Sequence, residues 1–216
     1  LNPKIKVIGV EPAGAACMKA SLKAGEVVSL PSGNTIADGT AVKRPGEKLF
    51  PYIQENVDDI ITVEDSELIV AFLDMVENHK MIVENSGLLT VAALRHLDVR
   101  KKKIVSILSG GNMDVITMAS IVQHGLIQRD RVFTVSVLLP DKPGELAKVA
   151  SLLAEQQGNV IKLEHNQFVS INRNAAVELR ITLEAFGTEH KNSIVAALND
   201  AGYRPKLVKS KSIYEM

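Results

Sequence analysis

Glycines and small polar residues follow an apolar stretch near the middle of the chain, in the sequence SGGN at residues 109–112. Residues 104–108 before it predict a buried strand, and residues 115–125 after it predict a helix. In open α/β sheets, ligands bind beyond the carboxyl ends of the strands, where helix N-termini carry partial positive charge. The Ser109 hydroxyl can donate or accept a hydrogen bond, and Asn112 can cap the helix. The residues alone leave two interpretations open, a ligand site or a structural turn.

The elements around this sequence alternate between strand and helix patterns. We expect strands at residues 5–10, 60–63 and 104–108. We expect one helix that ends at Gly25, one that begins in a capping box of Thr62 and Asp65, and one capped by Ser86. Residues 30–51 are rich in Gly, Pro and Asn and predict a long loop with a short helical turn around Ala41. The alternation predicts an α/β fold with a parallel sheet.

A second pattern begins near Asp130. The turn sequence PDKPGEL follows a strand at residues 132–138 and leads into a helix that ends at Gly158. Apolar and polar residues alternate over 177–185, as in a strand with one buried face, and a turn is expected before it at 172–174. The order βαββαβ predicts a ferredoxin-like antiparallel sheet with both helices on one side. We therefore expect two domains, residues 1–129 and residues 130–216.

Composition excludes several classes of function. The 216 residues carry a formal net charge of zero, so we expect neither nucleic acid nor an anionic membrane as a partner. No apolar run reaches the roughly 18 residues of a membrane span. The single cysteine, Cys17, rules out an intrachain disulfide framework and favours the cytoplasm. Because the chain begins at Leu1 with an apolar stretch soon after, we expect it to be part of a longer polypeptide.

Four sequence blocks carry a resemblance to a known family. The blocks VIGVEP, IADGTAVKRPGE, VENSG and ILSGGNMD occur in the order found in serine and threonine dehydratases. Residues 5–125 therefore resemble the fold type II family of pyridoxal phosphate enzymes. The remainder resembles an ACT domain, whose characteristic turn is similar to DKPGEL here. The resemblance implies part of a threonine ammonia-lyase, which converts L-threonine to 2-oxobutanoate and ammonia, with feedback by isoleucine or another amino acid through the ACT domain.

The resemblance also implies residues that bind pyridoxal phosphate. Ser109 would hydrogen-bond the pyridine nitrogen, Gly110 and Asn112 would complete that loop, Gly39 would lie beside the cofactor, and Glu84 near the ring edge. A neutral hydroxyl would leave the nitrogen unprotonated, which suits elimination. For Glu84 the alternative is a carboxylate at a helix end. The following residue, Asn85, is larger than the family pattern predicts.

Other parts of the family pattern are missing from this sequence. The Schiff-base lysine of a Ser-Phe-Lys motif and the glycine-rich phosphate loop do not occur, so we expect no catalysis by the chain alone. Related enzymes can hold a divalent cation where Glu11 and Ala15 lie, but Cys17 stands at the carboxylate position. Because Mg²⁺ and Ca²⁺ prefer oxygen ligands, we expect no dedicated metal site, and we expect Cys17 to be a buried apolar residue.

In the second half, the resemblance to ACT domains implies a site for a regulatory amino acid. Its expected residues are Asp141, Lys142, Gly144, Glu145, Leu146, Asn159, His165 and Asn166. Backbone N–H groups after Gly144 could receive a ligand carboxylate, although PDKPGEL could also be only a turn. We expect a homo-oligomer, a dimer or a tetramer. The alternative function is a non-catalytic amino-acid-binding module; a nucleotide-binding domain is disfavoured because VIGVEPAG lacks G-x-G-x-x-G spacing.

Overall fold

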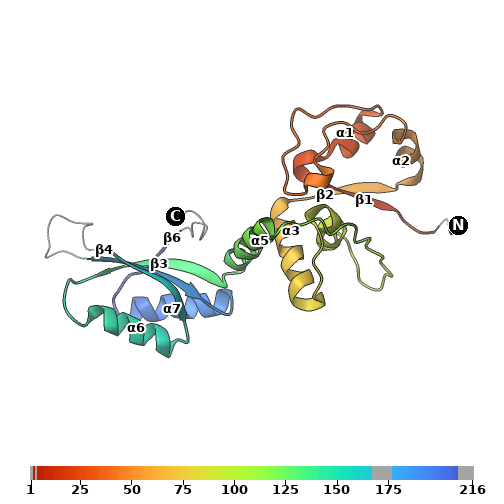
Figure 1. Cartoon of the computed structure of the whole chain (residues 1–216). Coiled ribbons are helices and arrows are strands. Elements are labelled where there is room, and N and C mark those ends of the chain that lie inside the picture. Colours follow the sequence, from red (N-terminus) through yellow and green to blue (C-terminus); the bar gives the residue numbers. More distant parts are fainter. Residues whose placement is uncertain (1, 3, 167–176, 209–216) are drawn as a thin grey trace. The chain divides into compact units, whose positions relative to one another are not determined.

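The chain folds into two compact units in a computed structural model that describes residues 2, 4–166 and 177–208 (Figure 1). The first unit spans Leu1–Val122 and the second Gln123–Met216. Helix α5 (Val115–Gln128) runs across this division. The domain boundary that we expect after residue 129 therefore remains a proposal. Among the described residues, no helix has the length and apolarity needed to cross a membrane.

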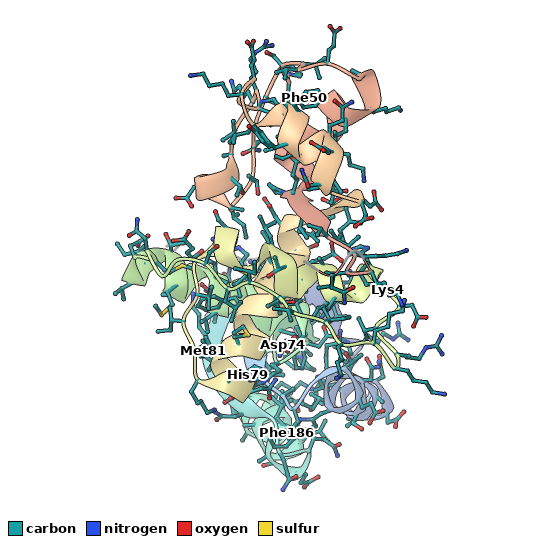
Figure 2. The ribbon with its side chains drawn as sticks, turned by 90° about the vertical axis from the view of Figure 1, so that its right-hand side faces the viewer. Lys4, Phe50, Asp74, His79, Met81 and Phe186 are labelled. Atoms are coloured by element: carbon teal, nitrogen blue, oxygen red, sulfur yellow. The ribbon has the colours of Figure 1, made fainter. Side chains whose placement is uncertain are left out.

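The first unit contains a parallel pair of strands, which confirms the expected parallel sheet. Strand β1 (Ile8–Pro12) lies beside β2 (Asp59–Val63), with Ile8 opposite Asp59 and Pro12 opposite Val63. Their crossover includes α1 (Cys17–Ala24), a 3₁₀ turn (Asp38–Thr40) and α2 (Phe50–Asn56). Helix α2 was not expected; it begins with Phe50, labelled in Figure 2, whose side chain is buried. Helix α1 ends at Gly25, as expected.

The helix after β2 starts with a different capping pair from the expected one. Glu64 and Glu67 form the capping box of α3 (Asp65–Asp74), and the Glu64 N–H donates to Glu67 Oε2 at 2.8 Å. Asp65 cannot act as the partner of Thr62 because its carboxylate accepts hydrogen bonds from the loop containing Ile36. A π-helical turn (Met75–His79) continues α3; Figure 2 labels Asp74, His79 and Met81 in this region.

The next helical segment also begins differently from the prediction. A 3₁₀ helix (Asn85–Leu88) leads into α4 (Leu89–Ala92) and another 3₁₀ turn (Ala93–His96). Glu84 occupies the N-cap position, and Ser86, the expected cap, lies inside the first turn. The core of this unit joins β2, α3, α4 and α5 through fully or nearly buried apolar side chains, among them Val63, Leu68, Phe72, Leu88 and Ile121.

The prediction of a buried strand at residues 104–108 is wrong. The segment forms no strand, and Val105 and Ile107 are 89% and 71% exposed. A strand needs neighbours to pair its backbone groups, and the described residues provide none beside this segment. Its contacts are with Thr90, whose Oγ1 donates to the Ile107 carbonyl at 3.0 Å.

Helix α5 follows this segment, as expected, and continues past Gly125 to Gln128. Its cap is Asp114 and not Asn112. Asp114 Oδ1 accepts the N–H groups of Ile116 and Thr117, each at 2.9 Å, and so satisfies the free donors of the first turn. Asn112 lies too far before the helix to make this contact.

The second unit confirms the ferredoxin-like βαββαβ fold. Its elements are β3 (Val132–Leu139), α6 (Glu145–Glu155), β4 (Asn159–Asn166), β5 (Val177–Glu184), α7 (Thr188–Asp200) and β6 (Lys206–Val208). The strands form one antiparallel sheet in the order β4-β5-β3-β6, and both helices cover the same face (Figure 1). Strand β5 alternates buried residues with half-buried or exposed ones along its length. The turn expected at residues 172–174 lies outside the described residues.

Candidate functional site

The side chain of Glu84 lies at the centre of the cluster that contains the SGGN sequence. Glu84 Oε2 accepts the Asn112 N–H at 3.1 Å. Gly110 has a φ of +77°, and a Cβ added there would lie 2.2–2.5 Å from the Glu84 carboxylate atoms. The left-handed backbone conformation favours glycine at position 110, and a larger residue there would also displace the Glu84 carboxylate.

A second loop reaches the same cluster from the 3₁₀ turn around Gly39. A Cβ added to Gly39 would lie 2.8 Å from Ser86 Oγ and 3.7 Å from Glu84 Oε1. The backbone of Ser109 packs against Gly87 in this cluster, because a Cβ on Gly87 would lie 1.8 Å from the Ser109 carbonyl oxygen. Gly39, Glu84, Ser109, Gly110 and Asn112, which sequence reasoning selected, are thus neighbours in space. Ser109 itself is exposed at the surface of this cluster.

Side chains that sequence reasoning did not select hold the Gly39 loop in place. Asp65 accepts the Thr35 hydroxyl at 2.6 Å and the Ile36 N–H at 3.0 Å. Asn85 Nδ2 donates to the Ile36 carbonyl at 2.9 Å. The VENSG block did draw attention to Glu84, but no local pattern indicates that its neighbour Asn85 contacts a loop far away in the sequence.

Two polar atoms in this cluster are buried without a hydrogen-bond partner among the described residues, Asn85 Oδ1 and Ser86 Oγ. The Asn85 side chain belongs to a residue that is only 5% exposed. Buried polar atoms are nearly always paired, and an exception calls for a water or a ligand. The cluster therefore combines glycine-lined loops, a carboxylate, an exposed hydroxyl and unused hydrogen-bonding capacity.

The Glu11 carboxylate caps a helix. Glu11 Oε1 accepts the Met18 N–H and Oε2 accepts the Lys19 N–H, each at 2.8 Å, so both oxygens cap the start of α1. Cys17 is buried, as expected, and burial, followed by the negative charge of Glu11, raises the pKa of its thiol. Within the ranges that the structure describes, no three His, Cys, Asp or Glu side chains are grouped as metal ligands.

The second unit contains a cavity of about 340 Å³ at the turn after β3. Six of the expected regulatory residues line it: Asp141, Lys142, Gly144, Glu145, Leu146 and His165. The other lining residues are Leu139, Pro140 and Pro143. Asn159 and Asn166 do not line the cavity, and Asn159 Nδ2 instead donates to Glu184 Oε2 at 3.1 Å.

Charges of both signs surround this cavity. Glu145 pairs with Lys148 at 2.7 Å, and this hydrogen bond raises the pKa of the Lys148 ammonium. The side chains of Asp141 and Lys142 make no ion pair with any residue in the described part of the chain. Gly144 adopts a φ of +91° at the N-cap of α6, so that the first N–H groups of the helix face the turn. A small zwitterion would find both an anionic and a cationic side chain here.

Both regions match known families. Residues 1–110 match the family model described as pyridoxal-phosphate dependent enzyme, and residues 133–202 match the ACT domain. The chain belongs to the pyridoxal-phosphate dependent enzyme family and carries an ACT domain after the part matched to that family.

Among curated proteins, the chain is similar to the L-threonine ammonia-lyase of Geobacter sulfurreducens, with 36% identity over 96% of this chain and 52% of the relative. It is 33% identical to the L-threonine dehydratase biosynthetic IlvA of Escherichia coli, over 94% of this chain and 39% of the relative. The chain spans about half the length, or less, of the curated relatives it matches.

The chain also resembles solved structures of related enzymes. The processed form of threonine deaminase isoform 2 from Solanum lycopersicum has a TM-score of 0.53 and 35% identity, covering 56% of this chain and 36% of that one. Maize serine racemase has a TM-score of 0.50 and 34% identity, covering 60% of this chain and 41% of that one.

Proposed function

We propose that this chain forms part of a threonine ammonia-lyase, an enzyme that converts L-threonine to 2-oxobutanoate and ammonia under the control of a regulatory amino acid. The observation that carries the proposal is the convergence of Gly39, Glu84, Gly110 and Asn112 around two unpartnered buried polar atoms. This cluster includes the end of the region matched to the pyridoxal-phosphate enzymes. The relatives named threonine ammonia-lyase and threonine dehydratase support the substrate.

The residues of the cluster fit pyridoxal phosphate. When bound, this cofactor withdraws electrons from the substrate carbon. Gly39 and Gly110 are exposed beside Glu84, the exposed Ser109 hydroxyl would hydrogen-bond the pyridine nitrogen, and Glu84 would lie near the ring edge. A hydroxyl does not carry the negative charge that would stabilise a protonated nitrogen. Ser109 would therefore bind and orient the ring and keep its nitrogen neutral.

We propose that catalysis also requires a polypeptide that carries the lysine and the glycine-rich phosphate loop absent from this sequence. The exposed apolar side chains of Val105 and Ile107 support this, because a strand supplied beside them would bury apolar surface and pair the backbone. The chain alone, mixed with pyridoxal phosphate and threonine, should yield no 2-oxobutanoate. The chain combined with a polypeptide carrying both motifs should yield it.

A pair of serine variants tests the role of the cluster in the combined enzyme. Ser109→Ala should lower kcat about tenfold or more through the loss of one hydrogen bond to the cofactor. Ser106→Ala is the matched control, since the Ser106 hydroxyl contacts the Thr90 carbonyl at 3.4 Å and not the cluster. Turnover by the chain alone, or equal activity of both variants, would contradict the proposal.

For the second unit we propose a site for an amino-acid effector, isoleucine or another branched amino acid. Lys142 and the N–H groups at the start of α6 would receive the carboxylate, Asp141 the ammonium group, and Leu139 and Leu146 the apolar side chain. In titration calorimetry, Lys142→Ala should weaken isoleucine binding about tenfold, the effect of one charge-assisted hydrogen bond. Lys162→Ala, a change outside the cavity lining, should not. Equal binding by both variants would refute the site.

The alternative function, an amino-acid-binding module without chemistry, is favoured by one observation: the cavity is formed entirely within the second unit. Effector binding without lyase activity in the combined enzyme would select this alternative. We also propose a cytoplasmic location, which the single cysteine supports.

We further propose a homo-oligomer, a dimer or a tetramer, in which the second unit associates through β4. Val160, Ile161 and Leu163 on this edge strand are 40–46% exposed, which leaves apolar surface and unpaired backbone groups for a second copy. Light scattering at micromolar concentration should give a mass above that of one chain. A monomer would refute this part of the proposal.

A further inference from the structure

The two consecutive residues Glu84 and Asn85 each hold a different loop of the candidate cofactor site. The Glu84 carboxylate accepts the Asn112 N–H at 3.1 Å, and its atoms fill the space beside Gly110. Asn85 Nδ2 donates to the Ile36 carbonyl at 2.9 Å, across a separation of 49 residues in sequence. The pair thus joins the loop of residues 110–112 to the loop that leads to Gly39.

The Asn85 bond matters because of how the Gly39 loop is attached elsewhere. On one side, the Asp65 carboxylate accepts the Ile36 N–H at 3.0 Å, which fixes the loop to the start of α3. On the other side, Asn85 Nδ2 donates a hydrogen bond to the carbonyl of the same residue. Beyond Ile36, Ala37 is fully buried and the 3₁₀ turn Asp38–Thr40 presents Gly39 to Ser86 and Glu84. Ile36 is therefore held between two side chains, and its position determines where Gly39 lies.

The orientation of the Asn85 amide is also fixed. Its NH₂ group must face the Ile36 carbonyl, because the opposite orientation would place two acceptors together. That orientation leaves Oδ1 buried with no donor in the described part of the chain. A buried acceptor without a partner destabilises the fold, so packing alone does not account for asparagine at this position.

We propose that Asn85 is a positioning residue, which fixes the Gly39 loop against Glu84 and so sets the distance between the two glycine loops that border the cofactor. That these loops border a cofactor rests on the proposed function. That Asn85 holds the Gly39 loop does not depend on the proposed function, because the hydrogen bond involves only groups within this chain.

The decisive variant is Asn85→Leu, which keeps the number and branching of the side-chain heavy atoms and removes both the donor and the unpartnered acceptor. Hydrogen-exchange mass spectrometry should show about tenfold faster amide exchange for the Gly39 loop, residues 36–40, the factor expected for the loss of one buried hydrogen bond. The melting temperature of the whole chain should change little, because the unpartnered Oδ1 is removed while the Ile36 carbonyl loses its donor. A residue that only filled space would change neither measurement, and one that only stabilised the fold would lower the melting temperature.

The matched control is Asn56→Leu. Asn56 Nδ2 also donates to a backbone carbonyl, that of Tyr52 at 2.9 Å, but it is exposed on α2 and its hydrogen bond stays within that helix. Exchange of residues 36–40 should not change in this variant. Unchanged exchange of these residues in Asn85→Leu, or faster exchange spread evenly over α3 and β2, would overturn the proposal.

The same variants separate this inference from the proposed function. In the combined enzyme, the pyridoxal phosphate concentration for half-maximal absorbance of the bound cofactor should rise severalfold for Asn85→Leu and not for Asn56→Leu. If the unchanged enzyme binds no pyridoxal phosphate, the proposed function fails. The exchange result for residues 36–40 still decides whether Asn85 positions the loop.

Discussion

Substitution of Gly87 by alanine should displace the SGGN sequence from the rest of the site. A Cβ at position 87 would lie 1.8 Å from the carbonyl oxygen of Ser109 and 2.9 Å from its carbonyl carbon and from Val83 Cγ1. Overpacking a protein interior costs about 1–3 kcal/mol. Because the obstructing atoms belong to the backbone and cannot rotate away, we expect the upper end, about 3 kcal/mol.

The neighbouring Gly111 supplies the control within the same loop. No atom lies within 4 Å of a Cβ added there, and its φ is outside the left-handed region. Gly111→Ala should therefore change stability by less than about 1 kcal/mol. The two substitutions add the same methyl group, so a difference between them reports only on the space around each glycine.

Hydrogen exchange of peptides from α3, recorded over a temperature series, measures the unfolding of the first unit by itself. At about 3 °C per kcal/mol for a unit of this size, Gly87→Ala should lower its transition by about 10 °C, and Gly111→Ala by less than about 3 °C. A shift below 3 °C for Gly87→Ala would show that residues 109–112 do not pack against position 87, and the proposed cluster would lose its geometric basis.

Three further substitutions test other contacts. Glu11→Ala should destabilise the first unit by about 1–2 kcal/mol in urea unfolding, because two N–H groups of α1 lose their cap. The hydrogen bond from Lys191 is the main cause that lowers the pKa of Asp130 in the folded state. The Asp130 carboxylate therefore stabilises the fold at pH values above its unfolded-state pKa, and this contribution is lost as pH falls through the lower folded-state pKa. Asp130→Asn should remove that part of the acid dependence, measured as unfolding free energy against pH. His190→Ala should destabilise the second unit by about 1–3 kcal/mol in urea unfolding, since the His190 ring bonds the Gln156 carbonyl at 2.6 Å and a backbone N–H.

The second unit was the more predictable part of the fold because the sequence patterns that mark its strands are local. Alternation along β5 identifies the buried face of one strand without knowledge of its neighbours. In the first unit, by contrast, residues 104–108 have the composition of a strand but lack neighbouring strands among the described residues. The helix caps at Glu64 and Asp114 each lie two residues after the expected ones, because several acidic and hydroxyl side chains near each start are able to cap.

The candidate sites, like the fold, could be predicted only where local sequence patterns mark their residues. The sequence blocks indicate Gly39, Glu84 and Gly110, but they give no role to Asn85, because its bond to Ile36 spans 49 residues. The resemblance to ACT domains places Asn159 and His165 in one regulatory site, although both lie on β4. Six residues along an extended strand span about 20 Å, more than a cavity for one amino acid can bridge. Strand geometry alone could therefore have excluded Asn159.

The arrangement of the first unit explains why loop contacts should affect both its stability and its site. Its described sheet has only two strands, and such a pair is marginally stable by itself. The loops of the site are held mainly by side chains that bond backbone groups, Asp65 and Asn85 at Ile36 and Glu84 at Asn112. Loss of one such bond should loosen one loop while the core around Phe72 stays folded, because Ala37 and Ile36 join that core by apolar packing and not through these bonds. Local exchange rates are therefore a more direct measure of this site than global stability.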